Sequence, residues 1–467
     1  MLFSSIFFIF VFLPITIAVY YLMPAERIKM RNIWLLVVSL IFYSWGEPIY
    51  IFLMVFSALF NYFMAILIDR EKDYNRKPKG ALTFTVVMNL LILGFFKYWG
   101  FLVGTINNVT GLDIRTVELA LPIGISFYTF QALSYIFDVY RGVVKVQTDP
   151  IKVALYLAFF PQLIAGPIVN YADIQKQFDK RKCSIQKFGE GAERFILGLG
   201  KKVILANNLG SMFTAICALG DDRFSCITAW IGIIAYTLQI YFDFSGYSDM
   251  AIGLARMFGF ELKENFNYPY ISTSITEFWR RWHISLGTWF RNYLYIPMGG
   301  NRCSKSRHMI NILIVWALTG LWHGANWNFV AWGAYYGLLL ILEKYVIGEK
   351  LAKLPTWLQH IYTLLIVIIG WTFFSITDTK EMFRYLAAMF GIGGVDFANT
   401  VTLYYLKSNA VLLIASVAAC TPIPIKEFRQ IEKNRPNVGL IALMCILIVS
   451  VSYLVFGSYN PFLYFRF

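Results

Sequence analysis

The chain has 467 residues, of which 58% are hydrophobic and only 15% are charged, whereas soluble globular domains are about 45–50% apolar and about 25% charged. This composition argues against a water-soluble fold and indicates a membrane protein. The net charge of +14 comes from Lys and Arg spread through short connecting segments. That distribution favours orientation signals beside anionic lipid over a nucleic-acid-binding surface.

Uncharged apolar stretches recur along the chain, and a bilayer crossing needs about 20 such residues. The first stretch, residues 1–25, lacks the basic start and cleavage site of a signal peptide, so we expect a retained span. We predict an all-α polytopic membrane protein, one integral-membrane domain over residues 1–467, with about ten or eleven transmembrane helices plus re-entrant and interfacial helices. The other stretches cover residues 32–46, 49–68, 80–101, 119–137, 153–172, 203–220, 226–242, 309–342, 360–377, 408–425 and 436–465.

Basic residues between these stretches predict the orientation, because Lys and Arg concentrate in cytoplasmic loops. Residues 27–31 and 70–79 are rich in Lys and Arg, whereas the Gly46-Glu47-Pro48 turn between them has neither. We therefore expect the N-terminus outside and both basic loops in the cytoplasm.

The next two basic segments, residues 141–145 and 176–187, both favour the cytoplasm, although an apolar stretch separates them. That stretch contains Pro161, Gly166 and Pro167, which interrupt helical hydrogen bonding. Broken backbone at membrane depth is tolerated only where protein or a water-filled cavity surrounds it. We predict a re-entrant pair of half-helices that enters and leaves on the cytoplasmic side.

Two carboxylates, Asp243 and Asp249, follow the apolar stretch 226–242. Ionised carboxylates are costly in lipid, so we expect both to face water or a partner. A solvated helix end that caps the next helix explains the same residues equally well.

Residues 274–291 predict an amphipathic interfacial helix, and Ser274 and Glu277 have capping-box spacing at its start. A membrane-surface anchor explains this pattern. The alternative is a cationic face that binds an anionic acyl donor, with His283 beside the point where the donor enters. At about 100° per residue, one face holds Arg280, His283, Gly287 and Arg291, and the opposite face holds Phe278, Trp282, Leu286 and Trp289.

Residues 309–342 contain no Asp, Glu, Lys or Arg, and one helix of that length would be about 50 Å long, well beyond a hydrocarbon core of about 30 Å. We expect it to break near Gly320 and Gly324, whose spacing also suits close helix packing. His323 lies between them. A buried core histidine explains it, but an ionisable group at bilayer depth is also a candidate for proton transfer.

Several other kinds of site lack support in the sequence. There is no Gly-rich phosphate loop, no dinucleotide-binding fingerprint and no G-x-S-x-G motif. The six cysteines are scattered, and none of the four histidines has metal-ligand spacing with them. We expect neither a disulfide framework nor a metal site.

The segment SITEFWRRWHISLGTWFRNYLYIPMGGNR at residues 274–302 resembles the signature of the membrane-bound O-acyltransferase family. More specifically, it resembles the branch of alginate O-acetyltransferases and related bacterial polysaccharide and peptidoglycan O-acetyltransferases. Supporting motifs run in order along nearly the whole chain: LPIGISFYTFQALSYIFDVYRG at 121–142, FPQLIAGPI at 160–168, YFDFSGYSDMAIGLARMFGF at 241–260 and GLWHGANWNFVAWGAYYG at 320–337.

This resemblance implies a multi-pass enzyme of the bacterial cytoplasmic membrane with a central tunnel. The implied donor is cytoplasmic acetyl-CoA, used as a substrate, with no tightly bound cofactor. The acetyl group would pass to an extracytoplasmic polysaccharide of the alginate, cellulose or peptidoglycan type. A secreted or membrane-anchored partner with an SGNH-hydrolase-like fold would receive it. The expected partners are this protein and the lipid bilayer, and we expect no nucleic acid.

Two family histidines match His283 and His323, and the resemblance implies that His323 is catalytic. We expect His323 to act as a general base, with His283 at the donor entry or assisting proton removal. Arginine side chains would steer the CoA phosphates, and no cofactor-binding residue is assigned. The residues expected to bind donor or substrate are Arg280, Arg281, Arg291, Asn326 and Trp322.

Two departures and two alternatives accompany this prediction. Asn292 and Tyr336 replace Asp and His of some relatives, so no role is carried onto either. One alternative is a D-alanyl transferase for teichoic acids that uses a small carrier protein. The other is a transporter or flippase without covalent chemistry, which re-entrant segments also suit. The sequence leaves the acceptor polysaccharide, the identity of the partner and the oligomeric state open.

Overall fold

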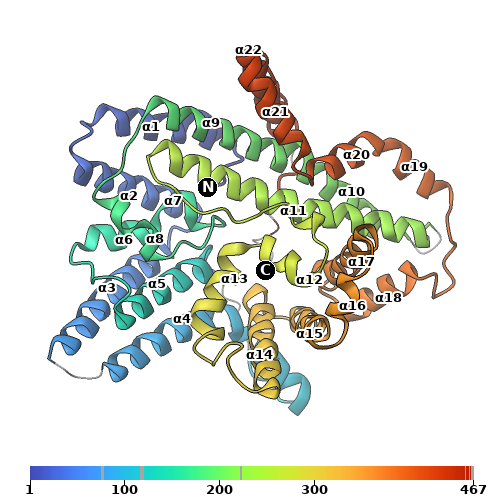
Figure 1. Cartoon of the computed structure of the whole chain (residues 1–467), viewed down its shortest axis with the longest axis horizontal. Coiled ribbons are helices and arrows are strands. Elements are labelled where there is room, and N and C mark those ends of the chain that lie inside the picture. The colour runs from blue at the N-terminus through green and yellow to red at the C-terminus, as the bar shows by residue number, and fades with distance from the viewer. Residues whose placement is uncertain (75–77, 116–119, 221–222, 458, 462, 464–467) are drawn as a thin grey trace. The chain divides into compact units, whose positions relative to one another are not determined.

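The computed structural model describes residues 1–74, 78–115, 120–220, 223–457, 459–461 and 463. Across these ranges the regular structure is helical, apart from an isolated bridge between Ser225 and Asp396 (Figure 1). The all-α class is therefore confirmed. The chain divides into two compact units, residues 1–195 with 248–264 and residues 196–247 with 265–467. The single domain expected over residues 1–467 stays a prediction.

The first unit is built mainly from the N-terminal helices, and α9 and α11 each contribute residues to both units. Its elements are η1 (Phe8–Phe12), α1 (Leu13–Leu22), α2 (Ile28–Ser44), α3 (Ile51–Asp73), α4 (Lys79–Thr110), α5 (Ile125–Arg141), α6 (Pro150–Ala158), α7 (Phe160–Leu163), α8 (Tyr171–Ile174), η2 (Gln175–Phe178) and the start of α9 (Ile185–Gly200).

The second unit holds most of the remaining helices. Its elements are η3 (Lys201–Ala206), α10 (Asn207–Cys217), most of α11 (Cys226–Met257), η4 (Pro269–Ile271), α12 (Ile275–Arg281), α13 (Ile284–Phe290), η5 (Arg291–Tyr295), α14 (Lys305–His323), α15 (Trp327–Leu342), η6 (Glu343–Ile347), α16 (Gly348–Ala352), α17 (Thr356–Ser375), α18 (Thr379–Met389), α19 (Thr400–Ser408), α20 (Ala410–Ala419), α21 (Ile423–Asn434) and α22 (Pro436–Phe456).

The proline- and glycine-rich stretch of the first unit breaks where the sequence predicted. α6 ends at Ala158, the four-residue α7 follows, and residues 164–170 are not helical. Gly166 has no room for a side chain, because a Cβ there would lie 2.5 Å from the Cα of Gln162. Gly124, at φ +76°, also has no room for a side chain, because a Cβ there would lie 2.8 Å from the carbonyl oxygen of Leu163. The side of the membrane that this break faces stays a prediction.

Asp243 and Asp249 lie inside α11, so the alternative of a solvated helix end is wrong. Asp243 forms an ion pair with Lys202 at 2.5 Å, with both side chains at most 3% exposed. Asp249 pairs with Arg194 at 2.8 Å. A buried charge is tolerated when an opposite charge accompanies it. These ion pairs therefore allow α11 to continue through both carboxylates, each of which has the kind of partner that the sequence predicted.

The uncharged stretch at residues 309–342 also breaks as expected. α14 ends at His323, and α15 begins after Asn326. Glycines let the two helices touch: a Cβ on Gly320 would lie 2.3 Å from the carbonyl oxygen of Phe329, and one on Gly333 would lie 2.5 Å from that of Trp316. Backbone-to-backbone packing thus fixes α14 against α15.

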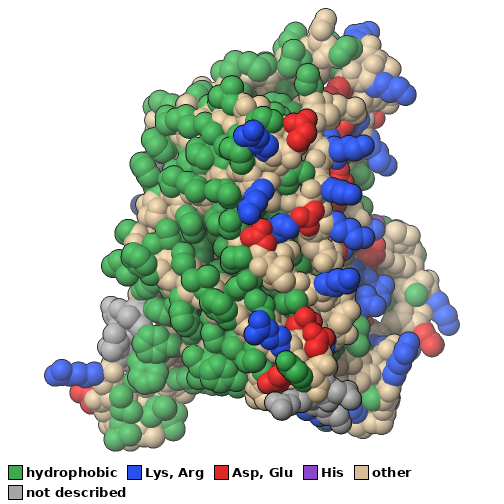
Figure 2. All heavy atoms as spheres, turned by 90° about the vertical axis from the view of Figure 1, so that its left-hand side faces the viewer, with side chains coloured by type: hydrophobic (Ala, Val, Ile, Leu, Met, Phe, Trp, Pro, Cys, Tyr) green, Lys and Arg blue, Asp and Glu red, His purple; other side chains and the backbone are tan. Residues whose placement is uncertain are grey.

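Six described helical segments are long and apolar enough to cross a membrane, or seven if the bent pair α19 and α20 is one span. The expected number of ten or eleven crossings stays a prediction. The count of six or seven leaves out shorter apolar helices such as Phe8–Leu22. Figure 2 shows a broad hydrophobic surface with Lys and Arg gathered along one side. Such an extensive apolar exterior is typical of a chain surrounded by lipid. The six segments are Ile51–Asp73, Lys79–Thr110, Cys226–Met257, Trp327–Ala352, Thr356–Ser375 and Pro436–Phe456.

Candidate active site

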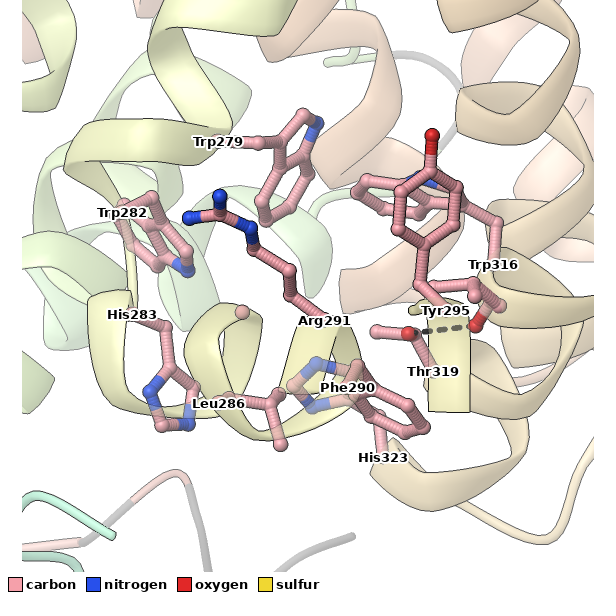
Figure 3. Close-up of a pocket in the computed structure, with 12 residues that line it drawn as sticks. Trp279, Trp282, His283, Leu286, Phe290, Arg291, Tyr295, Trp316, Thr319 and His323 are labelled. Carbon is pink, nitrogen blue, oxygen red and sulfur yellow. Dashed lines mark hydrogen bonds between the residues drawn. The ribbon is translucent and has the colours of Figure 1, made fainter. Parts of the chain in front are cut away.

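Helices of the second unit enclose a cavity of about 180 Å³ (Figure 3). One side, here called the bent wall, runs from α12 through α13 to the π-helical turn η5. The other side is α14, here called the straight wall. The cavity is lined by Trp279, Trp282, His283, Leu286, Gly287, Phe290, Arg291, Tyr295, Val315, Trp316, Thr319 and His323.

The bent wall begins at the predicted N-cap. The Ser274 hydroxyl accepts a hydrogen bond from the backbone N–H of Glu277 at 3.0 Å. The second half of the predicted capping box differs, because the Glu277 carboxylate accepts from the backbone and hydroxyl of Thr273 instead. α12 therefore starts where the sequence indicated. The Glu277 side chain, however, bonds to Thr273, the residue before the N-cap, and not to the N-cap residue Ser274.

The expected single amphipathic helix over residues 274–291 is wrong, because the chain bends at His283. This residue has φ +44° and ψ 54°, left-handed values that a non-glycine residue rarely adopts. Helical periodicity restarts after the bend, so the predicted separation of faces does not hold. Trp282 and Leu286, expected opposite His283, line the same cavity as His283.

Asn265 holds the bend in place. Its side-chain oxygen accepts hydrogen bonds from the backbone N–H of Ser285 at 3.1 Å and from the Ser285 hydroxyl at 2.8 Å. The same oxygen lies 3.2 Å from Nδ1 of His283. Because an amide oxygen only accepts, Nδ1 of His283 must carry the proton. The Nε2 lone pair is then available, and Nε2 has no hydrogen-bond partner among the residues that the structure describes.

Burial favours the neutral form of the His283 imidazole. The side chain is 3% exposed, and burial lowers the pKa of the imidazole from 6.5 to about 3. The rings of Phe244 and Trp322 lie 4.7 Å and 5.9 Å from the His283 ring. An uncharged imidazole in apolar surroundings can accept a proton or a hydrogen bond through Nε2.

His323 is the last residue of the straight wall. Its ring packs edge-on against Trp322, Trp332 and Phe374, with centroids 5.0–5.2 Å apart. The side chain is 8% exposed and lines the cavity. Figure 3 shows both imidazoles, His283 from the bent wall and His323 from α14, at the same end of the cavity. The two histidines singled out in the sequence, 40 positions apart, thus share one site.

Of the three predicted arginines, only Arg291 lines the cavity. Arg291 and Gly287 are exposed at its edge, and Figure 3 shows the Arg291 side chain extending toward Trp279 and Trp282. Arg281 instead pairs with Glu277 at 2.9 Å, and Arg280 is exposed outside the lining. The bend at His283 separates both from Arg291.

The two remaining predicted residues, Trp322 and Asn326, are not part of the cavity lining. Trp322 is buried, with its ring next to both imidazoles. Asn326 is the N-cap residue of α15. Among the described residues, no group of three or more His, Cys, Asp or Glu side chains is arranged to hold a metal ion.

Several residues of the site escaped sequence reasoning. Asn265 reaches His283 across 18 positions, and no local pattern links the two. Thr319 and Trp316 belong to the uncharged stretch, where the sequence pointed to His323, Trp322 and Asn326 instead. Tyr295 stands eight residues after Gly287 and four after Arg291. That spacing could have placed Tyr295 on the same side as Gly287 and Arg291, since residues four apart share a helix face.

Known proteins share both the family pattern and much of the sequence. Residues 143–385 match the model of MBOAT, the membrane-bound O-acyltransferase family. A probable alginate O-acetylase AlgI of Azotobacter vinelandii is 42% identical over 90% of this chain and 84% of its own length. Its counterpart from Pseudomonas aeruginosa is 44% identical over 90% of this chain and 81% of that protein. A peptidoglycan O-acetyltransferase of Helicobacter pylori is 34% identical over 85% of this chain and 81% of its own length.

The family model covers more than half of the chain, and these relatives cover most of the rest. His283 and His323 also line one cavity. The chain belongs to the membrane-bound O-acyltransferase family.

Proposed function

We propose that this multi-pass membrane enzyme transfers an acetyl group from cytoplasmic acetyl-CoA toward an extracytoplasmic polysaccharide. The observation that carries the proposal is the convergence of His283, His323 and Arg291 on a single cavity. The names of the relatives support acetyl transfer, with alginate and peptidoglycan as the acceptors that those names state. A polymer of the alginate, cellulose or peptidoglycan type is the proposed final acceptor.

His323 is proposed as the general base. It removes the proton from an acceptor hydroxyl, whose oxygen attacks the thioester carbonyl carbon; the new C–O bond forms and the C–S bond breaks. The proton then passes to the departing CoA thiolate, so the reaction balances without another reactant. Such acid–base assistance contributes about 10²–10⁴-fold in rate. The aromatic lining supports the step, because it limits the access of water to the thioester.

His283 and Arg291 have separate proposed tasks. The neutral His283 offers its Nε2 lone pair to a substrate hydroxyl or to the proton in transit. Arg291, at the exposed edge of the cavity, binds a phosphate of the donor through two parallel hydrogen bonds from its guanidinium group. Because Arg281 is already paired with Glu277, we assign donor steering chiefly to Arg291, with Arg280 as an outer contact.

The remaining proposals concern place and partner. The basic loops favour a bacterial cytoplasmic membrane with an extracytoplasmic N-terminus. A secreted or membrane-anchored SGNH-like protein is proposed to receive the acetyl group, and a tunnel past His323 is proposed to carry it outward. The donor is a substrate, and no tightly bound cofactor is proposed.

The test uses the full chain in lipid vesicles with acetyl-labelled acetyl-CoA on the side of the basic loops. Formation of free CoA, together with labelled ester on added partner protein or polysaccharide, is the expected result. A D-alanyl transferase would instead require a D-alanyl-loaded carrier protein and leave acetyl-CoA intact. A transporter would move an intact substrate without forming free CoA. Either outcome would overturn the proposal.

A further inference from the structure

A single π-helical turn, η6, is linked to both ends of the bent wall, directly to its start and through His308 to its end. Glu343 begins this turn and contacts the start of α12, and Tyr345, two residues on, leads through His308 to Tyr295 at the end of η5. None of these contacts was expected from the sequence, and the mechanism above uses none of them.

At the start of the wall, the Glu343 carboxylate caps α12. One oxygen accepts from the backbone N–H of Ile275 at 2.6 Å, and the other from the backbone N–H and hydroxyl of Thr276 at 2.9 Å and 2.7 Å. Glu343 is 5% exposed. A buried carboxylate is costly unless donors compensate it, and the free N–H groups of a helix N-terminus are suitable donors. The start of α12 is therefore fixed to η6.

At the end of the wall, His308 links two tyrosines. Its Nε2 lies 2.7 Å from the Tyr295 hydroxyl, and its Nδ1 makes a close hydrogen bond with the Tyr345 hydroxyl. His308 is 3% exposed. A neutral imidazole has one donor and one acceptor, so this buried ring is satisfied only when both tyrosines are present. Since His308 belongs to α14, this link also ties the bent wall to the straight wall.

We propose that Glu343, Tyr345 and His308 form a positioning clamp that holds the bent wall, with His283 and Arg291, at a fixed distance from His323. None of the three lines the cavity, so each acts through the residues it holds. This inference rests on the proposed function, since it names the residues that set the geometry of the same site. Asn265 still holds the His283 bend when the clamp is lost, so the main expected effect is the displacement of Arg291 from the donor.

The experiment combines kinetics with peptide-resolved hydrogen exchange on the full chain in lipid vesicles. In Glu343→Gln we expect faster exchange in residues 272–282, where two N–H groups lose a charged acceptor. In Tyr345→Phe we expect faster exchange in residues 292–304. KM for acetyl-CoA should rise about tenfold in Glu343→Gln, because hydrogen bonds to a charged group are weakened, and about threefold in Tyr345→Phe. In both variants kcat should change less than about twofold.

Matched controls and milder variants keep the test decisive. Glu349→Gln and Tyr404→Phe alter exposed residues of the same types and should change neither measurement. Should Glu343→Gln fail to fold, Thr276→Val removes a single donor and should show the same direction. Unchanged exchange in both clamp variants overturns the proposal, as does faster exchange with an unchanged KM. If the wild type forms no free CoA, the proposed function fails, and hydrogen exchange still decides whether the clamp exists.

Discussion

The two walls of the cavity are held by opposite means. The bent wall is interrupted, and hydrogen bonds fix it: Asn265 at the His283 bend and Glu343 at the start of α12. The straight wall is a continuous helix, and close apolar packing fixes it, with Gly320 against the backbone of α15. Each wall presents one histidine to the cavity.

This difference matches what each histidine needs. A hydrogen-bonded bend sets the tautomer of His283, because Asn265 accepts from Nδ1. Edge-on packing against the aromatic rings of Trp322, Trp332 and Phe374 sets the direction of the His323 ring. The comparison predicts that polar substitutions act on the bent wall and steric substitutions on the straight wall.

The largest expected effect follows from removing the His323 imidazole. In His323→Ala we expect kcat for acetyl transfer to fall about 10²–10⁴-fold, because the proposed general base is lost. Free CoA released from labelled vesicles measures the rate. His360→Gln changes a half-buried histidine outside the cavity lining and should leave the rate within a factor of about two. A folded His323→Ala protein with full activity would remove His323 from the mechanism.

A methyl group at Gly320 should break the straight wall. The Cβ of Gly320→Ala would lie 2.3 Å from a backbone oxygen of Phe329, so α14 and α15 must separate. We expect the free energy of unfolding to fall by about 2 kcal/mol, measured by denaturation in detergent micelles. Gly94→Ala in α4 meets nothing within 4 Å and should be neutral or slightly stabilising. Equal stability of both variants would show that packing does not fix this wall.

Removing the Asn265 amide should loosen the bend. In Asn265→Ala the two Ser285 donors lose their acceptor, and Nδ1 of His283 is no longer held protonated. We expect kcat to fall about tenfold and the unfolding free energy to fall by about 1 kcal/mol. Asn265→Asp keeps an oxygen acceptor at the same place and should recover most of the activity. Failure of Asp to outperform Ala would contradict the role of this oxygen.

The smallest effect concerns pH. The pKa of His283 is about 3 in the folded protein and near 6.5 in an unfolded chain. The unfolded state therefore binds the proton first as the pH falls, and stability that is complete above about pH 6.5 is lost progressively toward pH 3. At about pH 5.5 we expect a loss of about 1 kcal/mol relative to neutral pH. His283→Asn should lack this component in parallel denaturation curves, and identical pH dependence in both proteins would refute it.

The all-helical membrane architecture could be read from the sequence because it depends on composition and on local breaks. An uncharged stretch too long for one crossing had to break, and it does so at Gly324. Pro161 and Gly166 likewise interrupt the first unit where expected. The wheel over residues 274–291 failed because a left-handed His283 cannot be inferred from periodicity. Asn265, 18 positions away, stabilises that conformation.

The sequence by itself determined which residue types are available to the site: two histidines in apolar segments, a basic segment and glycines that let helices meet. Only the tertiary structure decided which of these share a cavity. It brought Arg291 to the site and left Arg280 and Arg281 outside, because one bend redirects the chain between them. The physical reason is that local propensities act over one or two turns, whereas Asn265, His308 and Glu343 fix the walls through hydrogen bonds between residues distant in the chain.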